Sequence, residues 1–228
     1  MPCHNAARII DRTLNEVMSS LGPSEEIVLV ENGSTDNTWL WIEQYLEEYP
    51  KPNIRIARSK KGLGNAIREG INLASGSYIV FMEDDLPFGL QELTLARQRV
   101  LIYDNKWNII SKYHSHSVGI TYRRIQGWGF ITLRELILNL KVRDSQGTFF
   151  AEAALTKKIS QLSSEEGFLI TTEFIAIARR LNVEITQIPC GSVFVSARKT
   201  TIGILDVGRM FIGLFRLRLK MGKLKYRE

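Results

Sequence analysis

Three consecutive acidic residues, Glu83, Asp84 and Asp85, follow an apolar segment typical of a buried β-strand. Neighbouring carboxylates repel one another, and a divalent cation bound among them relieves that repulsion. Mg²⁺ and Mn²⁺ prefer carboxylate oxygens and often share them with substrate phosphates. This cluster therefore indicates a divalent metal site. A solvated acidic turn leading into Leu86-Pro87 is the alternative.

A second polar pair, Glu31 and Asn32, ends another apolar strand. In open α/β sheets, ligands bind beyond the carboxyl ends of the strands. An acid and an amide at such a point can form hydrogen bonds to a base edge or to ribose hydroxyls. The segment that follows, Gly33-Ser34-Thr35-Asp36, would also make a turn and a helix cap without any ligand, so both interpretations remain open.

A third segment, Lys60 to Asn65 (KKGLGN), places two lysines and two glycines at the start of an expected helix. Such a start can favour an anion, which makes Gly62 a candidate phosphate-binding position. The spacing matches neither standard phosphate-loop motif, so a solvated turn is the alternative.

Strand and helix patterns alternate from Ile27 to Met82, which predicts a parallel sheet covered by helices and therefore an α/β fold. We expect a strand in 26–34 that runs into a turn and a strand in 77–87 that ends in acids. Further strands are expected at 54–57 and 108–113 and a strand region at 184–195, with a polar loop at 114–127. Helices are expected at 6–20, 35–48, 60–76, 130–140, 151–162 and 169–181.

The composition is that of a globular protein, with 228 residues, 44% hydrophobic and 24% charged. This excludes the disordered, collagen-like and fibrous classes. Two cysteines, Cys3 and Cys190, are too few for a disulfide scaffold, so we expect free thiols in a reducing compartment. No apolar run reaches the ~18 residues of a membrane span, and the first residues lack the apolar core of a signal peptide. We therefore expect a cytoplasmic protein.

The net charge of +6 is concentrated in the last part of the chain, because residues 198–228 contain nine basic and two acidic residues. Apolar residues recur there every three or four positions, and basic residues follow the same period on another face. This pattern predicts a basic amphipathic tail over 201–228, with residues 205–228 lying on an anionic membrane surface. A helix packed on its own domain with a solvated basic face is the alternative. Without interleaved aromatic residues or a known module, we expect no nucleic-acid partner. The apolar stripe is Met210, Leu214, Leu217, Met221 and Leu224; the basic residues are Arg209, Arg216, Lys220 and Lys223.

The order of these segments is more specific than any one of them. ENGSTD, then KKGLGNAIREGINLASGSYIVFMEDDL, then KVRDSQGTF resembles the family 2 glycosyltransferases, which have the Rossmann-like GT-A fold. The resemblance is closest to the branch that transfers mannose or glucose to dolichyl or polyprenyl phosphate. It extends through 167–173 to the strand that ends in Ile188-Pro189. It implies a GT-A domain over 1–200, a mostly parallel sheet flanked by helices.

The resemblance also implies roles for individual residues. Glu31 would read the nucleotide base with Asn32 beside it, and Asp85 would be the main ligand of a Mg²⁺ or Mn²⁺ ion that bridges the donor diphosphate. Glu83 would be a second metal ligand, and Pro2, Gly62 and Asp84 would lie around the nucleotide. Lys112 and Arg123 or Arg124 would bind phosphate groups, with Lys199 as a weaker phosphate candidate. Asp144 and Glu173 would lie near the acceptor.

The activity implied is metal-dependent, inverting transfer of a hexose from GDP-mannose or UDP-glucose to a polyprenyl or dolichyl phosphate. The enzyme would act on the cytosolic face of a membrane, and a separate partner chain would supply any membrane-spanning segment. One alternative is a family 2 enzyme with a soluble or glycan acceptor. The other is a degenerate paralogue that binds a nucleotide without turnover.

Two departures from the family pattern motivate the second alternative. The family's P-x-Y-N-E is Pro2-Cys3-His4-Asn5-Ala6 in this chain, and the family's S-G-F-R segment ends in Phe150, so an arginine is absent. The family's first strand also precedes the proline, whereas only Met1 stands before Pro2. We therefore expect that strand to be missing, with the true start upstream or the chain a fragment.

Overall fold

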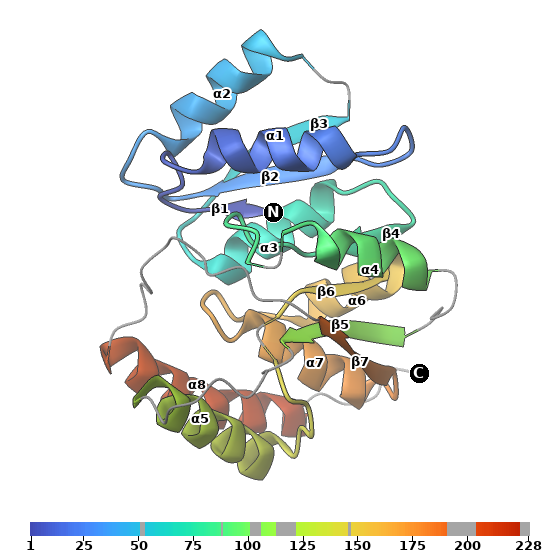
Figure 1. Ribbon diagram of the computed structural model, residues 1–228. Helices are drawn as coiled ribbons and strands as arrows, with labels where there is room; N and C mark the ends of the chain where they lie inside the picture. Colours follow the sequence, from blue (N-terminus) through green and yellow to red (C-terminus); the bar gives the residue numbers. More distant parts are fainter. Residues whose placement is uncertain are drawn as a thin grey trace.

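Two β-sheets form the centre of the protein (Figure 1). The computed structural model describes residues 1–50, 53–87, 89–100, 106–112, 122–145, 147–190 and 204–223, without the side chains of 111–112, 122–128 and 204–207. The first sheet is parallel and has the order β1 (Pro2–Cys3), β2 (Ile27–Asn32), β3 (Ile54–Ser59). The second has the order β4 (Tyr78–Val80), β6 (Phe149–Glu152), β5 (Lys106–Lys112), β7 (Glu184–Cys190), with β6 antiparallel to β4 and β5 and with β5 parallel to β7.

Helices pack around both sheets, as the alternating sequence pattern predicts. In the first of them, Ile10, Leu14 and Val17 recur at helical spacing and are buried. The helices are α1 (Ile10–Ser20), α2 (Thr38–Glu48), α3 (Leu63–Leu73), α4 (Gln91–Val100), α5 (Tyr122–Leu138), α6 (Ala153–Leu162), α7 (Ile170–Arg180) and α8 (Ile204–Lys223). The expected α/β class is confirmed.

Three elements differ from the sequence expectation. Helix α4 was not expected, because its sequence is mostly polar and only Glu92, Leu93 and Ala96 are buried. Helix α5 begins at Tyr122, inside the segment predicted to be a loop. Strand β6 occupies the start of the helix expected at 151–162, because Val80 and Asn108 on the neighbouring strands both pair with Phe150. In each case tertiary contacts outweigh local propensity.

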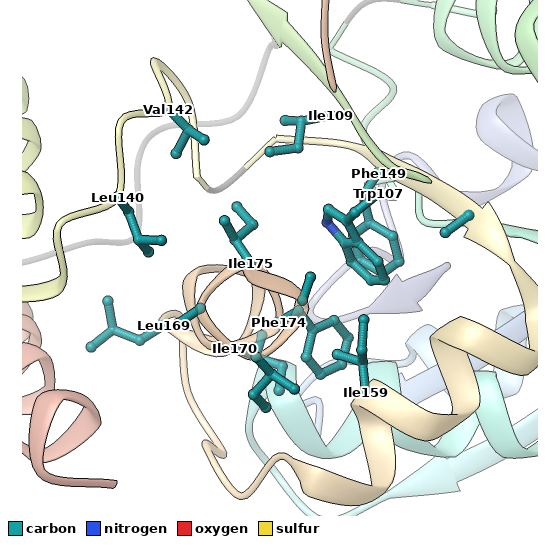
Figure 2. Packing of buried hydrophobic residues seen from close by; sticks show 14 of the residues in the cluster. Trp107, Ile109, Leu140, Val142, Phe149, Ile159, Leu169, Ile170, Phe174 and Ile175 are labelled. Carbon is teal, nitrogen blue, oxygen red and sulfur yellow. The ribbon is translucent and has the colours of Figure 1, made fainter. Parts of the chain in front are cut away.

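An aromatic cluster fills the core beneath the second sheet, and Figure 2 shows it between β5, β6 and α7. The rings of Trp107 and Phe149 stack with centroids 4.6 Å apart. Phe174 meets both of them edge-on, at 5.8 Å and 5.7 Å. Because aromatic side chains bury large apolar areas, this cluster holds two strands and a helix together.

The amphipathic stripe of the tail faces this same core. Leu214, Leu217 and Met221 of α8 are buried, and α8 packs against α5 and α7. The tail helix therefore packs on its own domain, with Met210 of the predicted stripe partly buried and Leu224 outside the described residues. No helix in the described ranges combines the length and apolar character that crossing a membrane requires.

The two-residue β1 starts at the proline itself, and the expectation that the family's first strand precedes this proline stays a prediction. Pro2 pairs with Val30 and Cys3 with Glu31, in parallel register with β2. Its carboxyl end consequently lies beside that of β2, which places the segment after Cys3 next to the Glu31-Asn32 pair.

Candidate functional site

The carboxyl ends of β1, β2 and β4 meet around His4. The backbone N–H of His4 donates to Asp84 Oδ2 (3.3 Å), and its ring Nδ1 lies 2.8 Å from the carbonyl oxygen of Asn32. Thr13 of α1 adds a hydrogen bond from its hydroxyl to the Asp84 carbonyl oxygen (2.7 Å). The structure thus brings together Asn32 and Asp84, which lie in two segments that the sequence predicted separately. His4 itself was not predicted, although it stands at the aromatic position of the family pattern.

Glu31 and Asn32 are both buried at the end of β2. Glu31 accepts a hydrogen bond from the Ser34 N–H (2.5 Å), and its other oxygen lies 3.5 Å from Arg58 Nε. Asn32 Oδ1 accepts a hydrogen bond from the Gly62 N–H (2.7 Å). Both side chains are therefore held in place by their surroundings, as the groups of a preorganised site are.

The loop after β1 is joined to the loop after β2 by short polar side chains. Asn5, in a left-handed conformation (φ 50°), accepts from the Thr35 N–H (2.8 Å) and donates its own N–H to Ser34 Oγ (3.0 Å). The Ala6 N–H donates to Thr38 Oγ1 (2.7 Å). Ala6, which replaces the family's acid, is fully buried, so a carboxylate there would lose its hydration. Gly33-Ser34-Thr35-Asp36 therefore does form a turn, and the same turn supports Glu31.

The glycine-rich start of α3 contacts the loop before α7. The Gly64 N–H donates to the Glu166 carbonyl oxygen (2.9 Å), and the Gly62 N–H is engaged by Asn32. A Cβ on Gly62 would collide with the Glu166 carbonyl oxygen, and one on Gly64 would collide with that of Glu165. Gly62 also has φ 131°, which L side chains rarely adopt. Both glycines therefore permit close backbone packing, and donor binding at Gly62 stays a prediction.

The acidic cluster after β4 divides into inner and outer members. Asp84 is buried against His4, whereas Glu83 and Asp85 are partly exposed. The chain then turns at Leu86, which is buried with φ 44°. Within the described residues, no three carboxylate, imidazole or thiol groups gather into a metal-binding cluster. Mg²⁺ and Mn²⁺ often take one or two carboxylates and complete their coordination with phosphate and water, so the outer pair fits that donor set.

Asp144 lies next to a buried arginine that the sequence patterns did not reveal. Arg134 of α5 donates to Ser145 Oγ (2.9 Å) and to the Val142 carbonyl oxygen. Burial lowers the pKa of Arg134, while the charges of Asp144 and Glu135 oppose that shift. The burial of Arg134 could have been inferred from the sequence, because Arg134 occupies the helical face shared by Phe130, Ile137 and Leu138.

Of the other predicted residues, the structure describes the side chain of Glu173 but not those of the predicted phosphate-binding residues. Glu173 is buried and accepts hydrogen bonds from the Ser164 and Glu165 N–H groups and from Lys220 Nζ (2.6 Å), so its carboxylate braces the loop and α8. Lys112 ends β5, and Arg123 and Arg124 lie in α5, with side chains outside the described part. Lys199 lies outside the described residues altogether.

The comparison with known families agrees with this geometry. The family described as glycosyl transferase family 2 matches residues 1–154, more than half of the chain. The chain belongs to glycosyl transferase family 2. This confirms the resemblance inferred from the order of the motifs, and the matched range includes every strand that carries the site.

Individual relatives are distant. A dolichyl-phosphate β-glucosyltransferase of Dictyostelium discoideum is 24% identical over 176 residues, covering 72% of this chain and 54% of that protein. A poly-β-1,6-N-acetyl-D-glucosamine synthase of Staphylococcus epidermidis is 30% identical over 98 residues, covering 40% of this chain and 24% of that protein. The match with this chain thus spans about half the length of the Dictyostelium relative and about a quarter of the staphylococcal one.

Solved structures confirm the GT-A fold. Glucosyl-3-phosphoglycerate synthase from Mycobacterium tuberculosis, crystallised with Mn²⁺, UDP and phosphoglyceric acid, superposes with a TM-score of 0.71 at 17% identity. The match covers 99% of this chain and 78% of that one. The same enzyme crystallised with Mn²⁺, UDP-glucose and glycerol 3-phosphate gives a TM-score of 0.70 at 16% identity, over 99% and 79% of the two chains.

Proposed function

We propose that the protein transfers glucose, with inversion, from UDP-glucose to a polyprenyl phosphate, with Mg²⁺ or Mn²⁺ as cofactor. The observation that carries this proposal is the meeting of Asn32 and Asp84 around His4, which joins the segment of the Glu31-Asn32 pair to that of the Glu83–Asp85 cluster. A base-reading pair after β2 and a metal-binding pair after β4, linked through His4, fit the two ends of a nucleotide sugar. UDP-glucose is preferred to GDP-mannose because the Dictyostelium relative and the mycobacterial neighbour are both named as enzymes that transfer or add glucose.

In this proposal each group has a distinct task. Glu31 and Asn32 hydrogen-bond the nucleoside, and Asp144 faces the acceptor, with Arg134 positioning its segment. Glu83 and Asp85 would hold the metal ion, which neutralises charge on the leaving diphosphate. A phosphate acceptor is already ionised at neutral pH, so orienting two anions matters more than removing a proton.

The exposed surface of α8 supports a lipid acceptor. Ile212, Phe215 and Leu219, here called the α8 outer face, are 57%, 58% and 67% exposed. Four basic residues on the same helix are also exposed: Arg209, Arg216, Arg218 and Lys223. Apolar side chains among cations suit an anionic membrane surface, the compartment of a polyprenyl phosphate. The peripheral, cytosolic membrane association predicted from the sequence is thus proposed through this face.

Radiolabelled UDP-glucose with polyprenyl phosphate in vesicles tests the activity. We expect label in the organic extract, with a loss of more than ~100-fold in Asp85→Asn. Asp11→Asn, at an exposed acid of α1, is the matched control and should retain activity. Label transferred only to a soluble phosphate such as 3-phosphoglycerate would replace the lipid acceptor with a soluble one. Donor binding without product on any acceptor would indicate a nucleotide-binding protein without turnover.

Sedimentation with anionic vesicles tests the membrane surface separately. Replacing Phe215 and Leu219 with serine should lower vesicle binding at least tenfold, because both side chains lose the apolar transfer that drives docking. Leu40→Ser, at a half-exposed leucine of α2, is the control. Equal binding by both variants would remove the α8 outer face from the proposal.

A further inference from the structure

An arginine and a tryptophan that belong to none of the sequence motifs lie beside Glu31. Arg58 of β3 is paired with Glu31 of β2 in parallel register, so the two side chains leave the same face of the sheet. Arg58 Nε lies 3.5 Å from Glu31 Oε2. The guanidinium carbon of Arg58 lies 4.5 Å from the ring centroid of Trp39, in the first turn of α2. Arg58 is therefore held between an aromatic face and a carboxylate.

These two contacts orient an arginine that is otherwise open to solvent. The side chain of Arg58 is 60% exposed, whereas that of Glu31 is 7% exposed. An arginine stacks its planar guanidinium on an aromatic ring, and the plane then fixes the directions of its N–H groups. With Nε turned toward Glu31 and the plane set by Trp39, the exposed end of the guanidinium can donate hydrogen bonds to a ligand.

Glu31 supplies the opposite kind of group at the same place. Its Oε1 accepts a hydrogen bond from the Ser34 N–H, and its Oε2 faces Arg58. An ionised carboxylate accepts several hydrogen bonds at once, so Glu31 can still accept one from a ligand. An acceptor and a set of donors thus stand side by side at the carboxyl ends of β2 and β3, the edge at which open α/β sheets bind ligands. This pair matches a ligand that carries an N–H next to a carbonyl group.

Two of the four common nucleobases carry that arrangement on their Watson–Crick edge. Uracil has a ring N–H beside a carbonyl oxygen, and so has guanine. Cytosine and adenine have the reverse, a ring nitrogen that accepts beside an amino group that donates. Either of them would place its amino group against the guanidinium and its ring nitrogen against the carboxylate. A site that loses its hydrogen bonds in this way discriminates strongly against the wrong ligand.

We propose that Arg58 determines base specificity, donating to the carbonyl oxygen of uracil or guanine while Glu31 accepts from the adjacent ring N–H. Trp39 is a positioning residue, because it acts on the base only through the plane of Arg58. The inference rests on the proposed nucleotide-sugar site and adds a rule for its donors: uridine and guanosine nucleotides bind, and cytidine and adenosine nucleotides are rejected.

Calorimetry of the full chain with UDP and CDP, each in the presence of Mn²⁺, tests this rule. The two nucleotides have the same ring size and the same diphosphate, so the ratio of their Kd values isolates the edge of the base. The wild type should prefer UDP by at least about tenfold, and Arg58→Met should lower this ratio at least about fivefold. Arg12→Met, at an exposed arginine of α1, is the matched control and should leave the ratio unchanged. GDP and ADP provide the same comparison for purines.

The role of Trp39 has its own pair of variants. Trp39→Leu should lower the ratio by about two- to threefold, and Trp39→Phe should restore most of it because a phenyl ring still stacks on a guanidinium. Trp41→Leu, at a neighbouring tryptophan of the same helix, should leave the ratio unchanged. A variant that only loses folded protein binds less of both nucleotides, so the ratio does not report a loss of stability.

The remaining outcomes overturn the inference and separate it from the proposed function. Equal weakening of UDP and CDP by Arg58→Met would assign Arg58 to the diphosphate or to stacking on the base. A wild type that binds UDP and CDP equally, or a preference that Arg58→Met leaves intact, would remove Arg58 from base recognition and leave the nucleotide-sugar site in place. A wild type that binds no nucleoside diphosphate would overturn the proposed function together with the inference.

Discussion

Both sheets of this protein pack on apolar cores, but the contacts beside those cores differ. Around β1–β3, short polar side chains such as Asn5, Thr38 and Asn32 tie one loop to the next through backbone hydrogen bonds. Around β4–β7, stacked aromatic rings hold strands to α7, and an ion pair between Glu173 and Lys220 joins α7 to α8. The first half therefore depends on polar contacts between loops, and the second on aromatic packing and a charge pair. An apolar cavity between β2 and β4 separates the halves, so each is expected to respond to substitution in its own way.

The aromatic half should show the largest loss of stability. Trp107→Ala removes a side chain that is 1% exposed and stacked on Phe149, and should lower the free energy of unfolding by about 3–5 kcal/mol. Trp41→Ala, at a tryptophan of α2 that is 41% exposed, is the matched control and should cost within about 0.5 kcal/mol. Urea unfolding measures both. Equal costs would contradict a rigid second half.

The ion pair of Glu173 with Lys220 should come next. Lys220→Met leaves the fully buried carboxylate without its cation and should cost about 3 kcal/mol in urea unfolding. Adding Glu173→Gln should restore part of that loss, because the remaining groups are neutral. Arg216→Met, at an exposed position of the same helix, controls for lost side-chain packing. A double variant no more stable than Lys220→Met would refute the pair as the cause.

The contact between the halves at the start of α3 should be weaker but more specific. Gly64→Ala should cost about 1–3 kcal/mol, because the loop at Glu165 must move away from the new Cβ. It should also weaken donor binding, since Asn32 is held by the neighbouring Gly62. Gly129→Ala, with nothing near its Cβ, should instead gain up to about 1 kcal/mol from helix propensity. Thermal unfolding and calorimetry separate the two effects, and identical behaviour of both variants would contradict the contact.

The smallest effect is expected at the cavity rim, where Arg97 of α4 meets Glu25. The hydrogen bond from Arg97 lowers the pKa of Glu25. A carboxyl with a lowered folded-state pKa stabilises above its unfolded value of about 4.3, and that contribution is lost as the pH falls through the folded value. Glu25→Gln should therefore cost less than about 1 kcal/mol at pH 7, and this cost should shrink as the pH falls below the unfolded value.

Glu47→Gln, at an exposed position of α2, is the control for this titration. A difference between wild type and Glu25→Gln that persists unchanged into acid would exclude the ion pair as its source. Unfolding curves at pH 7, 5 and 3 provide the comparison.

Much of the first half could be predicted because its signals are local. The alternation of strand and helix from Ile27 onward indicated the parallel sheet, and the polar residues that follow β2 and β4 marked the segments that meet at His4. The pattern could not predict the hydrogen bond between His4 and Asp84, because two residues 80 positions apart leave no periodic signal in the sequence. The second half was less predictable, since β6 forms against two neighbouring strands in a segment with helical character.

The sequence by itself determined the α/β class and membership of glycosyl transferase family 2, because periodicity and short motifs are properties of neighbouring residues. Only the tertiary structure decided which surfaces those elements cover. It turned Leu214 and Leu217 of α8 inward, buried Arg134 beside Asp144 and left an apolar cavity between β2 and β4. The physical reason is that an apolar face in the sequence predicts that the face is buried. It does not predict which element covers that face, because this depends on the shape of the whole fold.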